Sequence, residues 1–264
     1  MKNQRDVPLE KVHEELLVLL LSLDKICRES SIRYYITAGT LLGAVREGGF
    51  IPWDDDCDIV MPRRDFQRFV KMMRKVHSEI YYFQDRKSEP GYPFAFAKMR
   101  SRRVVARERG EVWKELGDGC YVDIFPLDRC PENPRRAKRF FKLTELFTSV
   151  ILSKSGGKCG YTKRGARLVF SMLSLFPLFA LHFLRAAVRI YYSATSSGGR
   201  LATAYGSYGY PRETYRAEWF SRTTTLSFEG HKFPAPIGYR ELLTNMYGDY
   251  MTPPNEENQR THLQ

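Results

Sequence analysis

The first third of the chain alternates between helix-like and strand-like patterns of apolar residues. Leucine and valine recur at helical spacing over residues 8–29, behind a proline that suits a first turn, and predict an amphipathic helix. A short β-rich run follows at residues 32–37. Residues 40–47 then form a second helical pattern, which Gly48 and Gly49 end.

The next segments predict the rest of a sheet. Residues 57–61 read as an apolar strand, and Pro62 begins a basic helical pattern over residues 63–77 with one apolar face. Further strand-like runs lie at residues 80–84, 94–99, 103–107 and 119–125. This early alternation favours a sheet core flanked by helices, and we expect the α+β class with a mixed sheet.

After Pro131 the pattern becomes helical and basic through residues 132–195. Within it, residues 168–184 contain no Asp, Glu, Lys or Arg, and Pro177 interrupts them. Three interpretations stay open: a buried helical pair, a hairpin lying in a membrane interface, and a membrane span. The proline and the short length disfavour the span.

The C-terminal part returns to a mixed pattern at residues 226–250, and the tail from Pro253 is polar. We therefore expect three regions. Residues 1–130 form the catalytic core, residues 131–200 form the mainly helical and basic region, and residues 201–264 pack back on the core.

The composition indicates a basic globular protein. The 264 residues include 42 Lys and Arg against 30 Asp and Glu, which gives a net charge of +12. Such a protein usually meets polyanions, such as nucleic acid, phosphorylated small molecules or an anionic membrane. The five cysteines contain no C-x-x-C pair, so we expect reduced thiols rather than disulfides or a zinc ribbon. The first residues lack the apolar core of a secretory signal, and we expect a cytoplasmic protein.

The chemistry concentrates in an acidic cluster directly ahead of the strand at residues 57–61. Asp56 and Asp58 are two positions apart, so on a strand they share one face. Two carboxylates on one face repel each other unless a cation lies between them, and hard oxygen ligands favour Mg²⁺ or Mn²⁺. Asp54 and Asp55 are expected to form a solvated acidic loop.

Two further features complete the candidate site. Gly39 and Thr40 follow a strand and precede a helix, and such a glycine turn presents backbone N–H groups to an anion. Asp123 lies in another apolar strand and is the candidate third carboxylate. Asp128 is a reserve candidate, more typical of a turn or cap.

Three blocks of this sequence resemble the LicD family. They are YYITAGTLLGAVREGGFIPWDDDCDIVMPRRDF, YVDIFPLD and FEGHKFPAPIGYRELLTNMYGDYMTPP, in the family's order. The resemblance spans roughly residues 10–262 and is weakest over 132–220. The family belongs to the nucleotidyltransferase-fold superfamily and includes phosphocholine transferases that modify bacterial lipopolysaccharide or teichoic acid. Fukutin-type phospho-alditol transferases are more distant relatives.

The resemblance implies a Mg²⁺- or Mn²⁺-dependent transfer of phosphocholine, or a related phospho-alcohol, from a CDP-linked donor to a hydroxyl of a surface glycan or glycolipid, with release of CMP. It implies that Gly39 and Thr40 form the glycine turn, that Asp56 and Asp58 bind the metal, and that Asp123 is the third carboxylate. An alternative is a nucleotidyltransferase that makes the CDP-linked donor and releases pyrophosphate. Family acceptors on lipid carriers imply peripheral contact with an anionic inner membrane face. The clustered carboxylates argue against a nucleic-acid partner.

Basic and aromatic side chains should hold the donor. The candidates for the diphosphate are Arg46, Lys98 and Arg100, and ordinary surface charge is the equal alternative for each. Trp53 is a candidate for stacking on the base or sugar, or for a cation–π contact with a trimethylammonium group. Tyr247 could stack in the same way, but core packing explains it at least as well.

Overall fold

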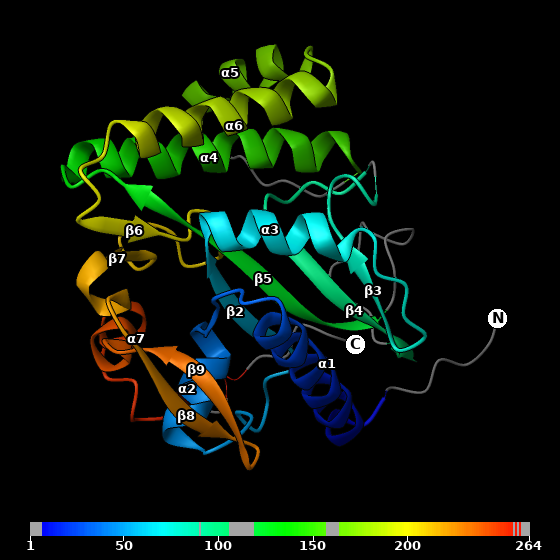
Figure 1. Cartoon of the computed structure of the whole chain (residues 1–264). Helices are drawn as coiled ribbons and strands as arrows, with labels where there is room; N and C mark the ends of the chain where they lie inside the picture. Colours follow the sequence, from blue (N-terminus) through cyan, green and yellow to red (C-terminus); the bar gives the residue numbers. More distant parts are fainter. Residues whose placement is uncertain are drawn as a thin grey trace.

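A computed structural model describes residues 7–89, 91–105, 119–156, 164–255, 257 and 259 of the chain. Seven helices and nine strands follow one another in this described part, with one short 3₁₀ helix, η1 (Figure 1). The helices are α1 (Leu9–Glu29), α2 (Ala38–Arg46), α3 (Arg63–Met73), α4 (Pro134–Lys154), α5 (Arg164–Ser174), α6 (Leu178–Ala194) and α7 (Tyr239–Tyr247), with η1 at Ala217–Phe220. The strands are β1 (Tyr35–Ile36), β2 (Cys57–Pro62), β3 (Tyr81–Gln84), β4 (Ala97–Val105), β5 (Gly119–Cys130), β6 (Arg200–Ala202), β7 (Thr214–Arg216), β8 (Thr223–Phe228) and β9 (His231–Pro236).

Seven of the strands form one mixed sheet in the order β1-β2-β5-β4-β3, with β6 and β7 attached at the far end of β5. The pair β2–β5 is parallel, and the other neighbouring pairs are antiparallel. Strand β5 is buried along almost its whole length, as a strand covered on both faces must be. It is the central strand because β2, β4 and β6 all pair with it. Strands β8 and β9 form a separate hairpin.

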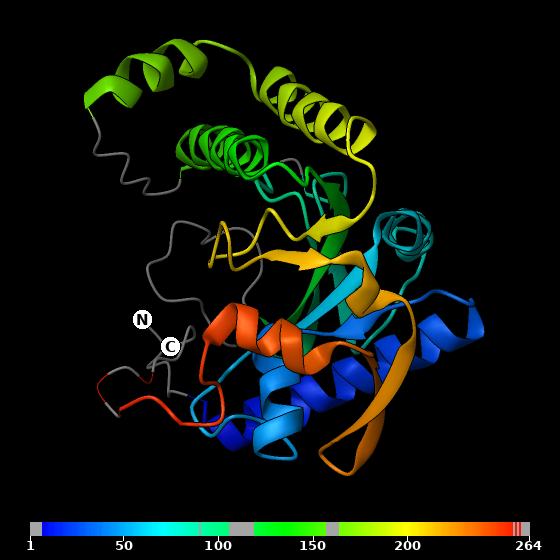
Figure 2. The same ribbon diagram turned by 90° about the vertical axis from the view of Figure 1, so that its left-hand side faces the viewer.

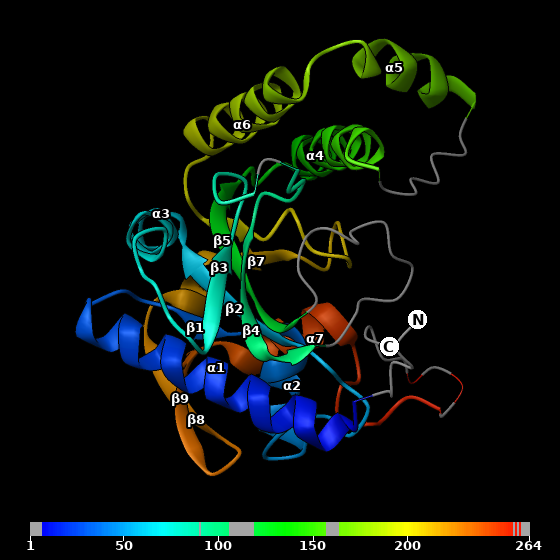
Figure 3. The same ribbon diagram turned by 90° about the vertical axis from the view of Figure 1, so that its right-hand side faces the viewer.

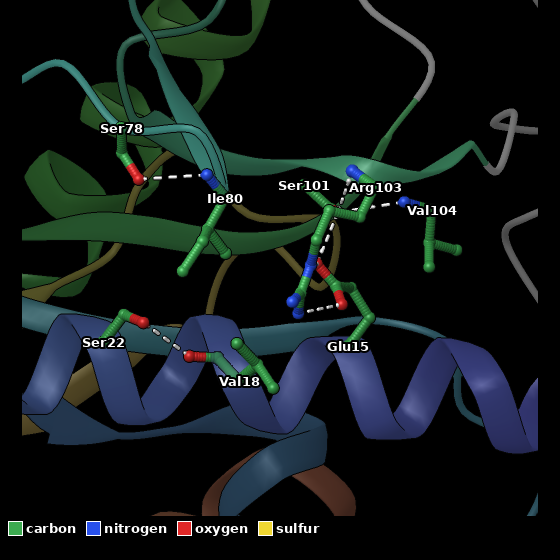
Figure 4. Close-up of polar contacts among 8 residues, drawn as sticks. All are labelled: Glu15, Val18, Ser22, Ser78, Ile80, Ser101, Arg103 and Val104. Carbon is green, nitrogen blue, oxygen red and sulfur yellow. Dashed lines mark hydrogen bonds and ion pairs between the residues drawn. The ribbon is translucent and has the colours of Figure 1, made fainter.

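Helix α1 covers one face of the sheet against β4 and β5. The apolar stripe predicted from its sequence is fully buried, at Leu16, Leu19, Leu20 and Leu23. A buried carboxylate, Glu15, fixes the helix to β4 (Figure 4). The Glu15 carboxylate accepts hydrogen bonds from Ser101 Oγ at 2.6 Å and from Arg103 Nη2 at 2.6 Å.

Helices α4, α5 and α6 form a layer at the other end of the molecule. Figures 2 and 3 show α4 between the sheet and the pair α5–α6. Asn133 begins α4 by accepting hydrogen bonds from the backbone N–H groups of Arg135 and Arg136, and Pro134 occupies the first turn. A small apolar cluster, which includes Phe147 and Leu181, joins α4 to α5 and α6.

The α+β class with a mixed sheet core is confirmed, with corrections to the bounds of several elements. Helix α2 begins at Ala38 rather than at residue 40. The runs predicted at 94–99 and 103–107 contribute to one strand, β4, which begins only at Ala97 and has a register shift between Arg100 and Val105. Residues 106 and 107 lie outside the described part. Strand β5 continues five residues past 125, because β6 pairs with its end. Helix α3 ends at Met73 rather than 77, and β1 is confined to Tyr35–Ile36.

The apolar segment at residues 168–184 is divided at Pro177, as its sequence predicts, into the end of α5 and the start of α6. Leu181 is fully buried, whereas Phe179 and Phe183 are 74% and 71% exposed. The interpretation as a buried helical pair is therefore wrong for the outward side of these helices. In the described part of the chain, no helix has the length and apolar character needed to cross a membrane. The regional boundaries at 130 and 200 stay a prediction.

The cysteines of the described residues are free and buried, at Cys27, Cys57, Cys120 and Cys130, and Cys159 lies outside this part. Burial raises the pKa of the Cys120 and Cys130 thiols to about 12. Thiols of this kind are apolar core residues with little reactivity, in line with the sequence-based expectation.

Candidate active site

A cavity of about 1120 Å³ lies between the central strands, α4, the loop at residues 203–210 and the segment after α7. Cavities of this size suit small-molecule ligands. Four of the carboxylates that line it come from the acidic loop, from β2 and from β5: Asp54, Asp56, Asp58 and Asp123. The others are Glu145 of α4, Glu213 and Asp249. The structure thus brings together acids that lie far apart in the sequence.

The pairing of β2 with β5 places Asp58 and Asp123 side by side, as direct partners in the parallel register. Helix α2 holds the backbone of Asp58 from the other side. The Asp58 N–H donates to Thr40 Oγ1 at 2.8 Å, and the Asp58 carbonyl accepts from Thr37 N–H at 3.1 Å. Thr40 is buried and does not line the cavity, so it positions Asp58 instead of meeting a ligand.

We expect Thr40→Val to weaken both stability and turnover. Valine keeps the shape but leaves the Asp58 N–H without its acceptor, which costs about 1–3 kcal/mol for a buried group. Urea unfolding and steady-state turnover measure the two effects. Thr40→Ser keeps the hydroxyl and should restore both. Full activity in the valine variant would contradict the positioning role.

Asp56 lies one residue before β2 begins, so the strand alternation used to pair it with Asp58 does not apply strictly. Both side chains nevertheless line the same cavity. The expectation of a solvated loop at Asp54 and Asp55 is wrong. Asp55 is only 2% exposed, and Asp54 lines the cavity beside the start of α2.

The role of Gly39 differs from the expected turn glycine. Gly39 lies in the first turn of α2, and the left-handed residue is Ala38, with φ of +44°. A Cβ atom at Gly39 would lie 2.3 Å from Asp54 Oδ2, so glycine is needed for close approach and not for its backbone angle. His13 of α1 supports the same loop, because its Nε2 lies 2.6 Å from the Asp54 carbonyl oxygen.

Lys98 faces Asp123 from the neighbouring strand β4. Its Nζ lies 2.9 Å from Asp123 Oδ1 and 3.4 Å from the ring centre of Tyr121. Lys98 is only 3% exposed, although it lines the cavity. Burial raises the pKa of the Asp58 carboxyl well above its usual value, the charges of Asp56, Asp123 and Asp54 raise it further, and Lys98 opposes them.

The donor set suits a hard divalent cation held by two carboxylates. The raised pKa of Asp58 reflects burial first and then the negative charge of its neighbours, which Lys98 opposes, and a bound cation would relieve that repulsion. Among the described residues, no group of three His, Cys, Asp or Glu side chains is arranged to hold one ion. Mg²⁺ commonly uses one or two carboxylates with substrate phosphates and water, so Asp56 and Asp58 fit this arrangement. Asp123 as a third ligand stays a prediction.

Of the three basic candidates, Arg46 and Lys98 line the cavity and Arg100 is not among the lining residues. Arg100 donates to Gln84 Oε1 at 2.7 Å and to the Gly119 carbonyl at 3.0 Å, which ties it to the sheet. It lies two positions beyond Lys98, but this placement does not support a contact with the donor.

Arg46 is better placed to meet an anion. Its Nη1 donates to the Tyr250 carbonyl at 3.2 Å and its Nε to Glu47 at 2.7 Å. Its Nη2 is buried and has no hydrogen-bond partner within the described residues. The Arg46 guanidinium lies 5.9 Å from the Trp53 ring centre, and both Trp53 and Tyr247 line the cavity.

Asp128 does not belong to this site, and it is neither a turn nor a cap residue. It lies within β5, is 2% exposed and is not among the lining residues of the cavity. Arg63 donates to both of its carboxylate oxygens, and Arg189 Nη1 lies 3.7 Å away. A bidentate arginine pair of this kind stabilises structure.

Glu213 is a cavity residue that the sequence analysis did not find. Its carboxylate accepts hydrogen bonds from the Gly209 N–H at 3.0 Å and the Tyr208 N–H at 3.4 Å. These bonds fold the loop at residues 203–210 against the cavity wall. No motif marks Glu213, because a single glutamate in a polar loop is unremarkable in sequence.

Burial raises the pKa of Glu213 to about 7, from an ordinary value of 4.5. The folded protein therefore binds this proton more tightly than the unfolded chain, and stability from this group is lost as the pH rises from 4.5 towards 7. At about 1.4 kcal/mol for each pKa unit, the loss is roughly 3 kcal/mol. We expect the stability of Glu213→Gln relative to the parent to increase by this amount across that window, as urea unfolding at several pH values measures. A constant difference would contradict the assignment.

Known proteins resemble this chain along most of its length. Residues 31–193 match the family model described as LicD/FKTN/FKRP, nucleotidyltransferase domain. The lipopolysaccharide cholinephosphotransferase LicD of Haemophilus influenzae is 30% identical over 261 residues, which cover 95% of each chain. An uncharacterised protein of Rickettsia typhi is 36% identical over 80 residues, covering 27% of this chain and 26% of that protein. By the family match and the full-length relative, this chain belongs to the LicD/FKTN/FKRP family.

Proposed function

We propose that this transferase moves phosphocholine, or a related phospho-alcohol, from a CDP-linked donor to a hydroxyl of a cell-surface glycan or glycolipid and releases CMP. The observation that carries the proposal is the cavity that joins Asp56, Asp58 and Asp123 in a chain 30% identical, over 95% of its length, to a lipopolysaccharide cholinephosphotransferase. A divalent cation held by Asp56 and Asp58 would neutralise charge on the donor phosphates.

The chain's own residues have separate roles in this proposal. The acceptor oxygen forms a bond to the phosphorus that carries choline, the bond from that phosphorus to the CMP oxygen breaks, and CMP leaves. Asp123 takes the proton of the acceptor hydroxyl. Lys98, 2.9 Å from Asp123 Oδ1, forms an ion pair with that carboxylate and holds it in position. The unpartnered Nη2 of Arg46 holds the donor diphosphate.

Aromatic rings also line the cavity, and they suit the binding of choline. A trimethylammonium group binds to the faces of aromatic rings, where it does not require hydrogen bonds. The aromatic lining residues are Trp53, Phe94, Phe96, Tyr121, Phe125, Phe141, Tyr205, Tyr208, Tyr210, Tyr215, Tyr247 and Tyr250. A cavity with both carboxylates and rings favours a cationic alcohol over a neutral one such as ribitol.

The test is the identity of the small product. Purified protein with Mg²⁺ is offered a panel of CDP-linked alcohols, with and without glycan acceptors, and nucleotides are separated by chromatography. We expect acceptor-dependent CMP release, fastest with CDP-choline. Pyrophosphate formed from CTP and phosphocholine would instead support the alternative, a nucleotidyltransferase that makes the donor.

The place of action is part of the same proposal. Acceptor glycans assembled on lipid carriers lie at the inner face of the membrane, and a basic protein with a net charge of +12 is attracted to anionic lipid there. We therefore place the transferase in peripheral contact with that surface.

A further inference from the structure

Exposed apolar side chains gather on α5, on α6 and on the turn between them. Nine large ones there are at least 45% exposed: Leu168, Val169, Met172, Leu175, Phe176, Phe179, Phe183, Ile190 and Tyr191. We call these nine residues the apolar face. In the rest of the described chain, only Val76, Tyr208, Ile237 and Met251 are large hydrophobic residues of comparable exposure, and they are scattered. A contiguous exposed apolar patch marks an interaction site in a stable protein.

The opposite side of the same helices is already packed. Leu181 is fully buried, and Phe170, Leu173 and Leu178 pack against the cluster that α4 contributes. The apolar face is therefore not the core-facing side of these helices, because that side is already packed. The turn between the helices projects furthest, since Leu175 is 85% exposed.

The charges of this layer indicate what covers the apolar face. Described residues 134–156 and 164–194 contain ten Lys and Arg and a single acid, Glu145. Six of the basic residues lie exposed on α4: Arg135, Arg136, Lys138, Arg139, Lys142 and Lys154. Lys154 lies beside α5, because its Nζ donates to the Ser174 carbonyl at 2.8 Å. A strongly basic layer that exposes apolar side chains complements an anionic lipid surface, as in helices that lie in a membrane interface.

The same layer forms a wall of the catalytic cavity. Lys138, Lys142 and Leu152 of α4 line it, and so do Asp249 and Tyr250 after α7. In Figures 2 and 3, α5 reaches past α4 on the side where this C-terminal segment lies. A surface that lies against α5 and α6 is therefore separated from the cavity by a single helix.

We infer that the apolar face inserts into the interfacial region of an anionic bilayer, and that this docking holds the cavity beside the head group of a lipid-linked acceptor. The second clause rests on the proposed function. The docking itself rests only on exposure and charge. The occupant is the lipid surface, and a second copy of the chain is the main competitor.

The experiment is flotation of the full chain with phosphatidylcholine vesicles, with and without phosphatidylglycerol. The test variant carries Phe179→Glu and Phe183→Glu, at positions 74% and 71% exposed. The matched control is Ile237→Glu, which is 40% exposed and lies between β9 and α7, away from α5 and α6 (Figure 1). Leu175→Glu gives an independent variant should the double substitution prevent folding.

We expect the parent and the control to float with anionic vesicles only, and to be released at about 1 M salt, where the Debye length falls to about 3 Å. The vesicle affinity of both test variants should fall at least about tenfold, while their far-ultraviolet circular dichroism stays native. CMP release with a water-soluble glycan acceptor should be unchanged. A change in CMP release with this soluble acceptor would bear on the proposed function and not on membrane docking.

Three results would overturn the inference. The first is a parent that floats with neither vesicle type, and the second is a pair of folded test variants that float as well as the parent. The third is a parent dimer in light scattering that the test variants lose without any vesicle binding, which would make the apolar face a contact between two copies.

Discussion

Asp58→Asn should abolish transfer while the protein stays folded. The amide occupies the same volume but is a poor ligand for a hard cation, and it leaves charge on the donor phosphates unneutralised. We expect turnover to fall at least about a thousandfold, which corresponds to roughly 4 kcal/mol of transition-state stabilisation. Because Asp58 is half-buried beside Asp56, Asp123 and Asp54, its neutralisation should also raise the melting temperature of the metal-free protein. Asp56→Asn should reduce turnover in the same way.

The control for this substitution is Glu218→Gln, which removes one carboxylate charge from an exposed position outside the cavity. It should leave turnover within about twofold of the parent, because long-range surface charge is screened by salt. Excess chelator should reproduce the Asp58→Asn loss in the parent. Full activity of the parent in chelator would exclude the metal from the mechanism.

Lys98→Met should be among the most destabilising single substitutions in the chain. Methionine fills the space of the lysine stem but leaves Asp123 buried without its ammonium partner, and breaking a buried ion pair from one side costs about 3–5 kcal/mol. Activity should fall as well, since Asp123 loses the ammonium group that holds its carboxylate 2.9 Å away and the base is no longer held in position for the acceptor proton. Denaturant unfolding gives the stability change, and CMP release gives the activity.

The matched control is Lys71→Met on the exposed surface of α3, where the same change removes a solvated charge. It should change stability by less than about 0.5 kcal/mol. If Lys98→Met unfolds at the same denaturant concentration as Lys71→Met, the Lys98–Asp123 pair does not hold the site together.

Much of the site was readable in the sequence because its parts lie on adjacent short elements. Asp58 and Asp123 sit in apolar runs that must be buried strands, and neighbouring buried strands bring their polar residues to one place. Likewise, the leucine spacing of α1 and the position of Pro177 fix two helix features that the structure confirms. Each of these is a local pattern.

The remainder depends on contacts between distant positions, which a single sequence does not contain. His13 and Asp54 are 41 positions apart, and Glu213 reaches the cavity only through a loop that its own carboxylate folds. Arg100 and Lys98 share a strand face by spacing, but Gln84 and the Gly119 carbonyl hold Arg100 out of the cavity. For α5 and α6, hydrophobicity alone could not distinguish a buried surface from an exposed one.

Phosphocholine transfer is tested most directly by comparing the amounts of modified acceptor and of CMP that form in one reaction. The protein is incubated with Mg²⁺, isotopically labelled CDP-choline and a glycan acceptor, and mass spectrometry follows the acceptor while chromatography follows CMP. We expect each labelled phosphocholine found on the acceptor to be matched by one CMP, and Asp58→Asn to yield neither. Transfer of the cytidylyl group to the acceptor, or CMP release with equal amounts of free phosphocholine and an unmodified acceptor, would contradict phosphocholine transfer.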